Sequence, residues 1–473
     1  MQKTKIIATL GPSCNSLNVI KSMLKSGLSV FRINTSHIQS EKEVSSIVKI
    51  IRNQSKKLGK STSIMMDLGG PKTRVVLKRG QKKIDIIKGK CYTIGPKNCS
   101  ITINTNIQIT KFKKDAKVKI DDGKIEFKYV KTINKKIKIV ATNSGQITAN
   151  KGVNFPGLKL KLPAVTKEDR KNIVMGINLN VDWFAQSFVR SPSNILPIKR
   201  ILDQHNKTIP IIAKIETTES IENLDQILKK YDGVLIARGD LGVEMELSNL
   251  PKLQKQIINK CLFYKKPSIV ATQMLESMIN HISPTRAEVN DVANAIYDGV
   301  DAIMLSAETA VGRHPVESVE MMSRISENIE SDIDASNFNR NMIDPLSAEI
   351  TNNYLAVCHA ACSISKNLDI KIIVVLTETG KTAIQMAQFR PNAIIVAITP
   401  HQNTCNLLSI IWGVVPIFKK QPQNINSIYN IVNRTLLKNK LIKSGENFLI
   451  TSGILKLKNS TNMLQIYQSK WIK

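Results

Sequence analysis

Several short apolar runs of this sequence have charged side chains at their C-terminal ends or in the residues that follow. Two of these are acids, Glu216 and Asp240, and three are bases, Arg32, Arg74 and Lys214. Carboxylate oxygens are ligands that Mg²⁺ prefers, while guanidinium and ammonium groups bind phosphate oxygens. The combination indicates phosphoryl transfer, in which cations and a carboxylate-held metal ion stabilise the transferred group. Other polar residues in equivalent places are Asn34, Ser36, His37, Asp67, Arg238, Thr272, Gln273, Ser306 and Glu308.

Segment 239–242, Gly-Asp-Leu-Gly, is predicted to begin a helix directly after one of these runs. The first N–H groups of a helix have no partner within it, so a carboxylate can bind there. A network of structural ion pairs is the alternative for the whole set of residues, because such networks gather charges in the same way. The number of polar residues in equivalent places favours a site.

The apolar runs themselves predict an α/β fold. They read as strands buried on both faces, which is typical of parallel sheets, and amphipathic helical patterns separate many of them. Eight such units fit a (β/α)8 TIM barrel, with an open doubly wound sheet as the alternative. In a barrel, the active site lies just past the C-terminal ends of the strands. The runs are 5–10, 30–33, 63–66, 183–186, 210–215, 234–237, 268–271 and 302–305.

Two further domains interrupt or follow the predicted barrel. Residues 71–163 are rich in strand and turn signals, which predicts an all-β domain inserted between barrel segments 1–70 and 164–335. After a polar linker, residues 345–473 alternate again between helix and strand patterns. They predict a separate C-terminal α/β domain.

Composition narrows the class of protein. The formal charge is +31, but aromatic residues make up only 5%, so base-stacking surfaces are scarce and we expect no nucleic-acid partner. The first apolar run is too short for a signal peptide, and the longest, at 407–418, is too short to span a membrane. Seven scattered cysteines without a Cys-x-x-Cys pair indicate a reducing compartment. We therefore expect a soluble, cytoplasmic protein.

Nine sequence segments together resemble the pyruvate kinase family, in matching order and spacing along the whole chain. They are TKIIATLGP at 4–12, FRINTSH at 31–37, DLGGPKTR at 67–74, AKIE at 213–216, ARGDLGVE at 237–244, ATQMLESM at 271–278, PTRAE at 284–288, DVANA at 291–295 and MLSAETA at 304–310. The resemblance implies phosphoryl transfer from phosphoenolpyruvate to ADP, giving pyruvate and ATP in the last step of glycolysis. It also implies a homotetramer.

The resemblance assigns roles around the transferred phosphoryl group. Arg32 is expected to bind the phosphate of phosphoenolpyruvate, and Lys214 to bridge donor and acceptor. Glu216 and Asp240 are expected to hold Mg²⁺, with Mn²⁺ as a substitute. The main chain of Gly239 and Asp240 is expected to bind the substrate carboxylate.

The remaining catalytic and nucleotide roles also come from the resemblance. Thr272 would contact the carboxylate and lies where the enolate is protonated, with Ser306 and Glu308 in a water-linked proton relay. The inserted β domain would be a lid that closes over the nucleotide and excludes water. The residues similar to nucleotide-phosphate contacts are Arg74, Lys151 and His37.

One position departs from the family pattern. The monovalent-cation pocket corresponds to Asn34, Ser36, Asp67 and Leu68, where the last residue is commonly Thr. Family members that need K⁺ tend to carry Glu where this chain has Lys72. We expect the Lys72 ammonium to replace the ion, which makes K⁺ dispensable.

The C-terminal domain resembles the regulatory domain of the family. A turn between a strand and a helix is either a helix cap or a phosphate cradle, and the resemblance favours a cradle for an effector, a sugar phosphate or a nucleotide. Glycines common in the family's effector loop are replaced by Leu457, Lys458 and Asn459, so regulation is expected to be altered or lost. The cradle residues are Thr377, Thr379, Gly380, Lys381 and Thr382.

Two other functions compete with a pyruvate kinase. A basic barrel kept for nucleic-acid binding would be a relict enzyme, but intact Arg32, Lys214 and Asp240 argue against loss of catalysis. A barrel lyase acting on similar substrates would need neither the inserted domain nor Arg74. RNA retained by the purified protein at moderate salt would favour the relict.

Overall fold

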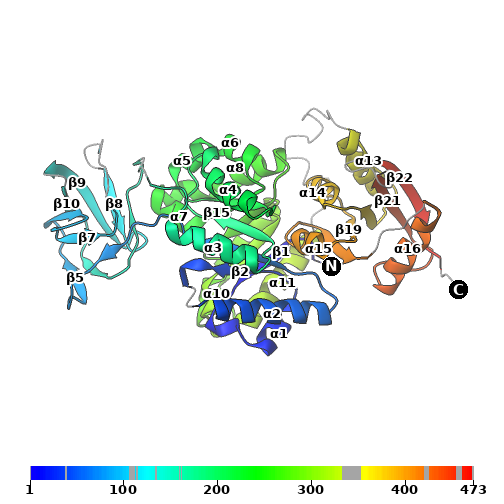
Figure 1. Ribbon diagram of the computed structural model, residues 1–473, viewed down its shortest axis with the longest axis horizontal. Coiled ribbons are helices and arrows are strands. Elements are labelled where there is room, and N and C mark those ends of the chain that lie inside the picture. Colours follow the sequence, from blue (N-terminus) through cyan, green and yellow to red (C-terminus); the bar gives the residue numbers. More distant parts are fainter. Residues whose placement is uncertain are drawn as a thin grey trace.

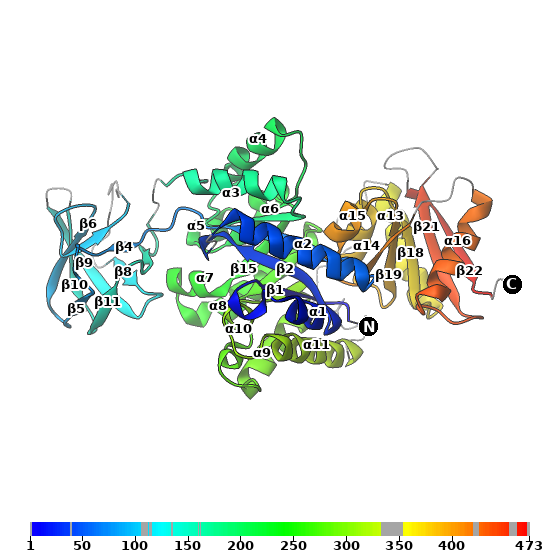
Figure 2. The same ribbon diagram turned by 60° about the horizontal axis from the view of Figure 1, so that its bottom comes forward.

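The computed structural model describes residues 2–37, 40–105, 112, 116–133, 136–158, 160, 162–332, 353–419, 425–453 and 461–470. These residues form a central barrel with a β domain at one end and an α/β domain at the other (Figures 1 and 2).

Eight parallel strands form the closed barrel. Their order around it is β1-β17-β16-β15-β14-β13-β3-β2. All eight predicted runs are strands of this barrel, so the TIM-barrel prediction is confirmed and the open doubly wound sheet is wrong. The strands are β1 (Lys5–Thr9), β2 (Leu28–Asn34), β3 (Ser63–Leu68), β13 (Trp183–Gln186), β14 (Ile211–Ile215), β15 (Gly233–Ala237), β16 (Ser268–Ala271) and β17 (Ala302–Leu305).

Helices surround the barrel, and hydroxyl side chains begin several of them. Ser16, Thr166 and Thr285 each accept a main-chain N–H of the first turn, which satisfies a donor without a helical partner. The helical segment 218–230 is divided, because Asn223 ends one helix and begins the next. The helices are α1 (Leu17–Lys25), α2 (Glu41–Lys57), α3 (Lys167–Asn178), α4 (Leu196–Gln204), α5 (Thr218–Glu222), α6 (Leu224–Lys230), α7 (Arg238–Glu244), α8 (Leu250–Phe263), α9 (Arg286–Tyr297), α10 (Ala307–Ala310) and α11 (Pro315–Asp332), with short 3-10 turns at Pro12–Cys14, Thr35–His37, Pro192–Ile195, Leu247–Asn249 and Glu276–Ile279.

Alternate strand residues fill two apolar layers. Ile6 and Phe31 belong to the core between the strands and the helices. Ile7, Met65 and Trp183 belong to the barrel interior, which is continuous with a core of the C-terminal domain. Side chains therefore fill the interior of the barrel, as in other closed barrels of this type.

The β domain lies between β3 and α3 in the chain. It consists of a seven-stranded sheet, order β12-β8-β9-β10-β6-β7-β4, and the pair β11-β5. Phe127, Ile137 and Ile139 belong to its own apolar core. The strands are β4 (Val75–Val76), β5 (Lys83–Ile86), β6 (Cys91–Gly95), β7 (Ile101–Ile103), β8 (Lys117–Ile120), β9 (Ile125–Ile133), β10 (Lys136–Ala141), β11 (Gly145–Thr148) and β12 (Val153–Asn154).

The C-terminal domain has a five-stranded sheet of order β20-β19-β18-β21-β22, in which only β22 is antiparallel to its neighbour. Its elements are α13 (Asn353–Asn367), β18 (Ile372–Leu376), α14 (Lys381–Ala387), β19 (Ile394–Thr399), α15 (Gln402–Leu408), β20 (Val414–Phe418), α16 (Ile425–Lys438), β21 (Asn447–Gly453) and β22 (Thr461–Gln468). Among the described residues, no helix combines the length and apolarity that a bilayer span requires.

Contacts between the domains determine which end of the barrel is free. The C-terminal domain covers the N-terminal ends of the strands: Lys5 Nζ donates to the Val414 carbonyl at 2.8 Å, and Arg390 pairs with Asp301 at 3.1 Å. The β domain is attached after β3, at the opposite end (Figure 2). The C-terminal strand ends therefore face the β domain.

Candidate functional site

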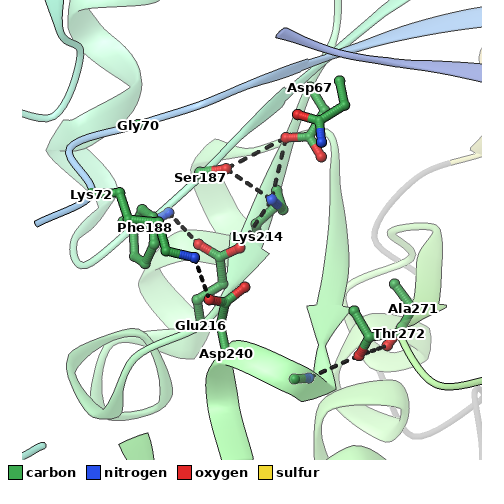
Figure 3. A network of polar contacts seen from close by, with 12 residues as sticks. Asp67, Gly70, Lys72, Ser187, Phe188, Lys214, Glu216, Asp240, Ala271 and Thr272 are labelled. Carbon is green, nitrogen blue, oxygen red and sulfur yellow. Dashed lines mark hydrogen bonds and ion pairs between the residues drawn. The ribbon is translucent and has the colours of Figure 1, made fainter. Parts of the chain in front are cut away.

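The rim facing the β domain gathers the charged residues predicted from the sequence. Arg32 lies in β2, Asp67 in β3 and Lys214 in β14, each near the C-terminal end of its strand. Glu216 follows β14, and Asp240 lies in the first turn of α7 after β15. Figure 3 shows Asp67, Lys214, Glu216 and Asp240 directed toward one another. Residues far apart in the sequence thus form one cluster.

Asp67 links the two cations of this cluster. Its Oδ2 atom lies 2.6 Å from Arg32 Nη2, and its Oδ1 atom lies 3.2 Å from Lys214 Nζ. Burial alone would raise the pKa of this carboxyl, but the charges of Lys214 and Arg32 outweigh it and lower the pKa. Asp67 therefore stays ionised and holds both cations in place.

Lys214 is a buried cation between two carboxylates. Its ammonium lies 2.9 Å from Glu216 Oε1, and only 10% of its side chain is exposed. Burial would lower its pKa, but Asp67 and Glu216 raise the pKa above the ordinary value. The lysine is therefore a fixed positive charge at neutral pH, suited to a developing negative charge.

Glu216 and Asp240 suit a divalent cation. Glu216 is buried and accepts the Phe188 N–H at 2.6 Å, and Asp240 Oδ1 lies 3.4 Å from Lys72 Nζ. Burial is the main cause that raises the pKa of Glu216, and the neighbouring Asp240 charge adds to it. Two carboxylates side by side, with an ammonium against one, are a donor set that fits Mg²⁺. In the described part of the chain no group of three or more acidic, His or Cys side chains is arranged to hold a metal ion.

Thr272 lies on the other side of α7, in a strained loop. Its backbone φ is +74°, and the Arg238 guanidinium donates to its carbonyl at 2.7 Å and pairs with Asp291. Its hydroxyl accepts the Gly239 N–H at 2.8 Å and donates to the Ala271 carbonyl (Figure 3). Gly239 and Thr272 thus lie together, and the carboxylate site expected of them stays a prediction.

Ser306 and Glu308 follow β17 on the neighbouring part of the rim. Glu308 is 2% exposed, and its carboxylate accepts the N–H groups of Ser306 at 2.7 Å and Leu275 at 3.2 Å. Burial raises its pKa. Because Leu275 is in the loop that carries Thr272, Glu308 joins that loop to the end of β17.

The predicted nucleotide residues lie at the base of the β domain. Arg74 forms a β-bridge with Gly152, and its guanidinium donates to the Asn150 carbonyl at 2.7 Å. Lys151 pairs with Asp121 at 2.8 Å. The structure thus brings Arg74 and Lys151 together, whereas the side chain of His37 lies outside the described part.

The predicted monovalent-cation pocket is partly polar. Asn34 Oδ1 accepts the Ser36 N–H at 3.2 Å, while Leu68 is 1% exposed and packs into the core. Lys72 contacts Asp240, one of the two predicted Mg²⁺ ligands. The replacement of K⁺ by the Lys72 ammonium stays a prediction.

The predicted effector cradle is the turn between β18 and α14. Gly380, at φ +82°, donates its N–H to Thr377 Oγ1 at 2.9 Å, and the hydroxyls of Thr382 and Thr461 are 2.8 Å apart. Lys381 Nζ lies over the Tyr354 ring at 5.3 Å, and Thr379 is exposed. The predicted changes at Leu457, Lys458 and Asn459 lie outside the described residues.

Two residues of the cluster were missed by sequence reasoning. Ser187 and Phe188 directly follow β13 and contact Lys214 and Glu216. The strand-end rule that identified the other residues applies equally to the run 183–186, so the signal was present. Ser187 is a hydroxyl residue of the same kind as Ser36 and Ser306, which were singled out by their places after a strand.

Comparisons with known proteins agree with this geometry. The family model "Pyruvate kinase, barrel domain" matches residues 1–319, and "Pyruvate kinase, alpha/beta domain" matches residues 355–467. The chain is 37% identical to the pyruvate kinase of Staphylococcus epidermidis, over 99% of this chain and 80% of that protein. It is 36% identical to pyruvate kinase 2 of Synechocystis sp., over 98% of this chain and 79% of that protein.

A solved structure agrees with both the fold and the family. The crystal structure of a pyruvate kinase from Cryptosporidium parvum superposes with a TM-score of 0.92 at 30% identity, covering 99% of this chain and 96% of that one. The chain therefore belongs to the pyruvate kinase family and has the phosphotransferase function that the family name states.

Proposed function

We propose that this chain moves the phosphoryl group of phosphoenolpyruvate to ADP at the cluster around Lys214, giving pyruvate and ATP. The observation that carries the proposal is the buried Lys214 ammonium, held between Asp67 and Glu216 next to Arg32. Phosphoryl transfer requires positioning and positive charge more than covalent chemistry from the protein. A fixed cation beside metal-binding carboxylates meets that requirement.

Arg32 and Lys214 act on the transferred group. Arg32 binds the phosphate of phosphoenolpyruvate, since Asp67 uses one edge of its guanidinium and the group still has donors to spare. Lys214 donates to the oxygens that gain charge as the bond from phosphorus to the enol oxygen breaks and a terminal ADP oxygen bonds to phosphorus. The chain thus supplies orientation and charge.

Glu216 and Asp240 are the residues that would hold Mg²⁺, or Mn²⁺ in its place, with substrate oxygens as further ligands. The bound ion supplies positive charge to phosphate oxygens of donor and acceptor. Phe188 orients Glu216 by its main-chain N–H, and Lys72 balances part of the charge on Asp240. In this proposal Lys72 also makes K⁺ dispensable.

Thr272 and α7 act on the other end of the substrate. The main chain of Gly239 and Asp240 binds the carboxylate together with the Thr272 hydroxyl, which exchanges its present partners for the ligand. The enolate left by phosphoryl transfer takes a proton at its terminal carbon on the Thr272 side. Ser306 and Glu308 complete a water-linked relay, which is supported by the burial that raises the pKa of the Glu308 carboxyl.

The β domain is proposed to be the lid over the nucleotide. Arg74, Lys151 and His37 bind the ADP phosphates when the lid closes and excludes water. The contact between Arg74 and Asn150 supports this, because it places the guanidinium at the root of the lid, next to the rim.

Further properties are proposed on family resemblance. The assembly is a homotetramer in the cytoplasm, and the turn at Thr377–Thr382 binds the phosphate of a sugar-phosphate or nucleotide effector. The domain limits at 71, 163, 335 and 345 also stay predictions, and the last two fall outside the described residues.

A coupled assay of pyruvate formation tests the reaction. We expect turnover with phosphoenolpyruvate, ADP and Mg²⁺ together, and none when the metal is chelated. The lyase alternative predicts that phosphoenolpyruvate is consumed without ADP. Its consumption in an assay mixture that lacks ADP tests this. The nucleic-acid alternative predicts folded protein without turnover. Neither alternative is favoured by the family relatives.

A further inference from the structure

Ser187 is a buried serine that touches both charged partners at the centre of the cluster. It directly follows β13 and is 3% exposed. Its hydroxyl accepts a hydrogen bond from Lys214 Nζ at 2.8 Å and donates one to Asp67 Oδ1 at 3.4 Å (Figure 3). It bears no charge and belongs to none of the predicted roles.

The Lys214 ammonium has a hydrogen-bond acceptor for each of its donors. An ammonium group has three N–H donors. Three acceptors surround this one: Glu216 Oε1 at 2.9 Å, Asp67 Oδ1 at 3.2 Å and Ser187 Oγ at 2.8 Å. Each donor therefore has one acceptor, which fixes the end of a flexible four-carbon side chain at one point.

Ser187 differs in kind from the other two acceptors. Both carboxylates reduce the net positive charge near Lys214, whereas the hydroxyl orients the ammonium without neutralising it. Its donation to Asp67 directs an oxygen lone pair toward Lys214. The hydroxyl is thus itself held in one orientation.

The surrounding backbone fixes Ser187 in turn. Phe188, at φ +53°, uses its N–H for Glu216, and Gly70, at φ +67°, packs against the turn at the root of the lid. A Cβ atom on Gly70 would lie 2.9 Å from the Ser187 Cβ, closer than carbon atoms pack. The turn is therefore clamped between the lid root and the metal-binding carboxylate.

We propose that Ser187 is a positioning residue, which holds the Lys214 ammonium where the phosphoryl group passes. The inference rests on the proposed role of Lys214. Loss of a hydrogen bond to a charged group should lower kcat by about 10-fold to 100-fold. The KM values for phosphoenolpyruvate and ADP should change by less than about threefold, because Ser187 acts on transfer and not on ground-state binding.

An isosteric pair of variants separates the hydroxyl from packing. Ser187→Thr and Ser187→Val add the same bulk, but only the first keeps a hydroxyl. We expect Ser187→Thr to retain most of the kcat, whereas Ser187→Val and Ser187→Ala should lose it. Circular dichroism and thermal melting verify that each variant is folded. Ser63→Ala is the matched control: Ser63 is also buried, lies at the start of β3, and its hydroxyl has no partner among the described residues. It should leave kcat unchanged.

Two results would overturn the inference. A merely structural role predicts that the Thr and Val variants lose activity equally and melt at lower temperature. Equal kcat in Ser187→Val and the unaltered chain would exclude any role in transfer. Lys214→Met in the same assay separates the two proposals. If this variant retains turnover, the proposed role of Lys214 is wrong. If it abolishes turnover while Ser187→Val keeps the full kcat, only the proposed role of Ser187 is wrong.

Discussion

The rim of the barrel and the turn between β18 and α14 are both polar loops at the C-terminal ends of parallel strands, but they are built differently. At the rim, Asp67, Lys214 and Glu216 are almost fully buried, and each is held by partners from other strands. At the turn, Glu378 and His401 pair at 2.6 Å with about half of each side chain exposed, and Thr377 bonds within its own turn.

The difference reflects what each region must do. Charges that stabilise a transition state must be oriented before the reaction, because reorientation costs free energy at the moment of transfer. A group that responds to an effector must instead exchange solvent or local partners for a ligand. Charges that are buried and held by several partners therefore indicate catalysis here, and solvent-exposed charges indicate at most reversible binding.

Lys214→Met should have the largest effect of any single substitution. It removes the transferring cation and leaves Asp67 and Glu216 without the ammonium that lies between them, so kcat should fall by about 10²-fold to 10³-fold. The coupled pyruvate assay measures this. Lys381→Met removes a lysine of the turn and is the matched control, expected to keep kcat within about twofold. Comparable losses in both variants would break the distinction between the two regions.

Glu216→Gln should weaken Mg²⁺ binding. The Mg²⁺ concentration that gives half-maximal activity should rise by about 10-fold to 100-fold. The pKa of Glu216 is raised by burial, so protons compete with the metal at higher pH than at an ordinary glutamate. As pH falls, the unaltered chain should therefore need more Mg²⁺, whereas the variant, which cannot ionise, should lose most of this dependence. Titrations of Mg²⁺ at several pH values test it, and a parallel pH response in both chains would contradict the assignment.

Lys72→Glu should change the ion requirement. The unaltered chain should keep most of its activity when tetramethylammonium replaces K⁺, because the Lys72 ammonium supplies positive charge beside Asp240. The variant should be stimulated by K⁺ by about tenfold, a factor that corresponds to 1.4 kcal/mol. Lys72→Met controls for loss of charge alone. Loss of most of the activity of the unaltered chain when K⁺ is absent would refute the prediction.

The sequence predicted the barrel well because each strand is short, apolar and buried on both faces. The run at 183–186 is an example: Trp183 and Phe184 are at most 1% exposed. The charged rim could also be predicted, since the strand-end rule needs only the order of elements. Which residues contact one another within the rim could not be predicted. That Lys72 contacts Asp240, or that Ser187 contacts Lys214, depends on the path of loops whose positive φ values, as at Phe188, leave no pattern in the sequence.

Thr382→Val should have the smallest effect on catalysis and a measurable effect on stability. Thr382 and Thr461 are buried, and their hydroxyls pair at 2.8 Å between α14 and β22. Valine keeps the shape but removes the hydroxyl that pairs with Thr461, which costs about 1–2 kcal/mol and lowers the melting temperature of this domain by a few degrees. The basal kcat should stay within about twofold, since the site lies on the far side of the barrel from the rim. With glucose 6-phosphate as the probe, an increase in melting temperature in the unaltered chain that disappears in Thr382→Val would support a phosphate cradle. A fall in kcat without a change in melting temperature would mean that the turn acts on the rim directly, and the contrast between the two regions would no longer hold.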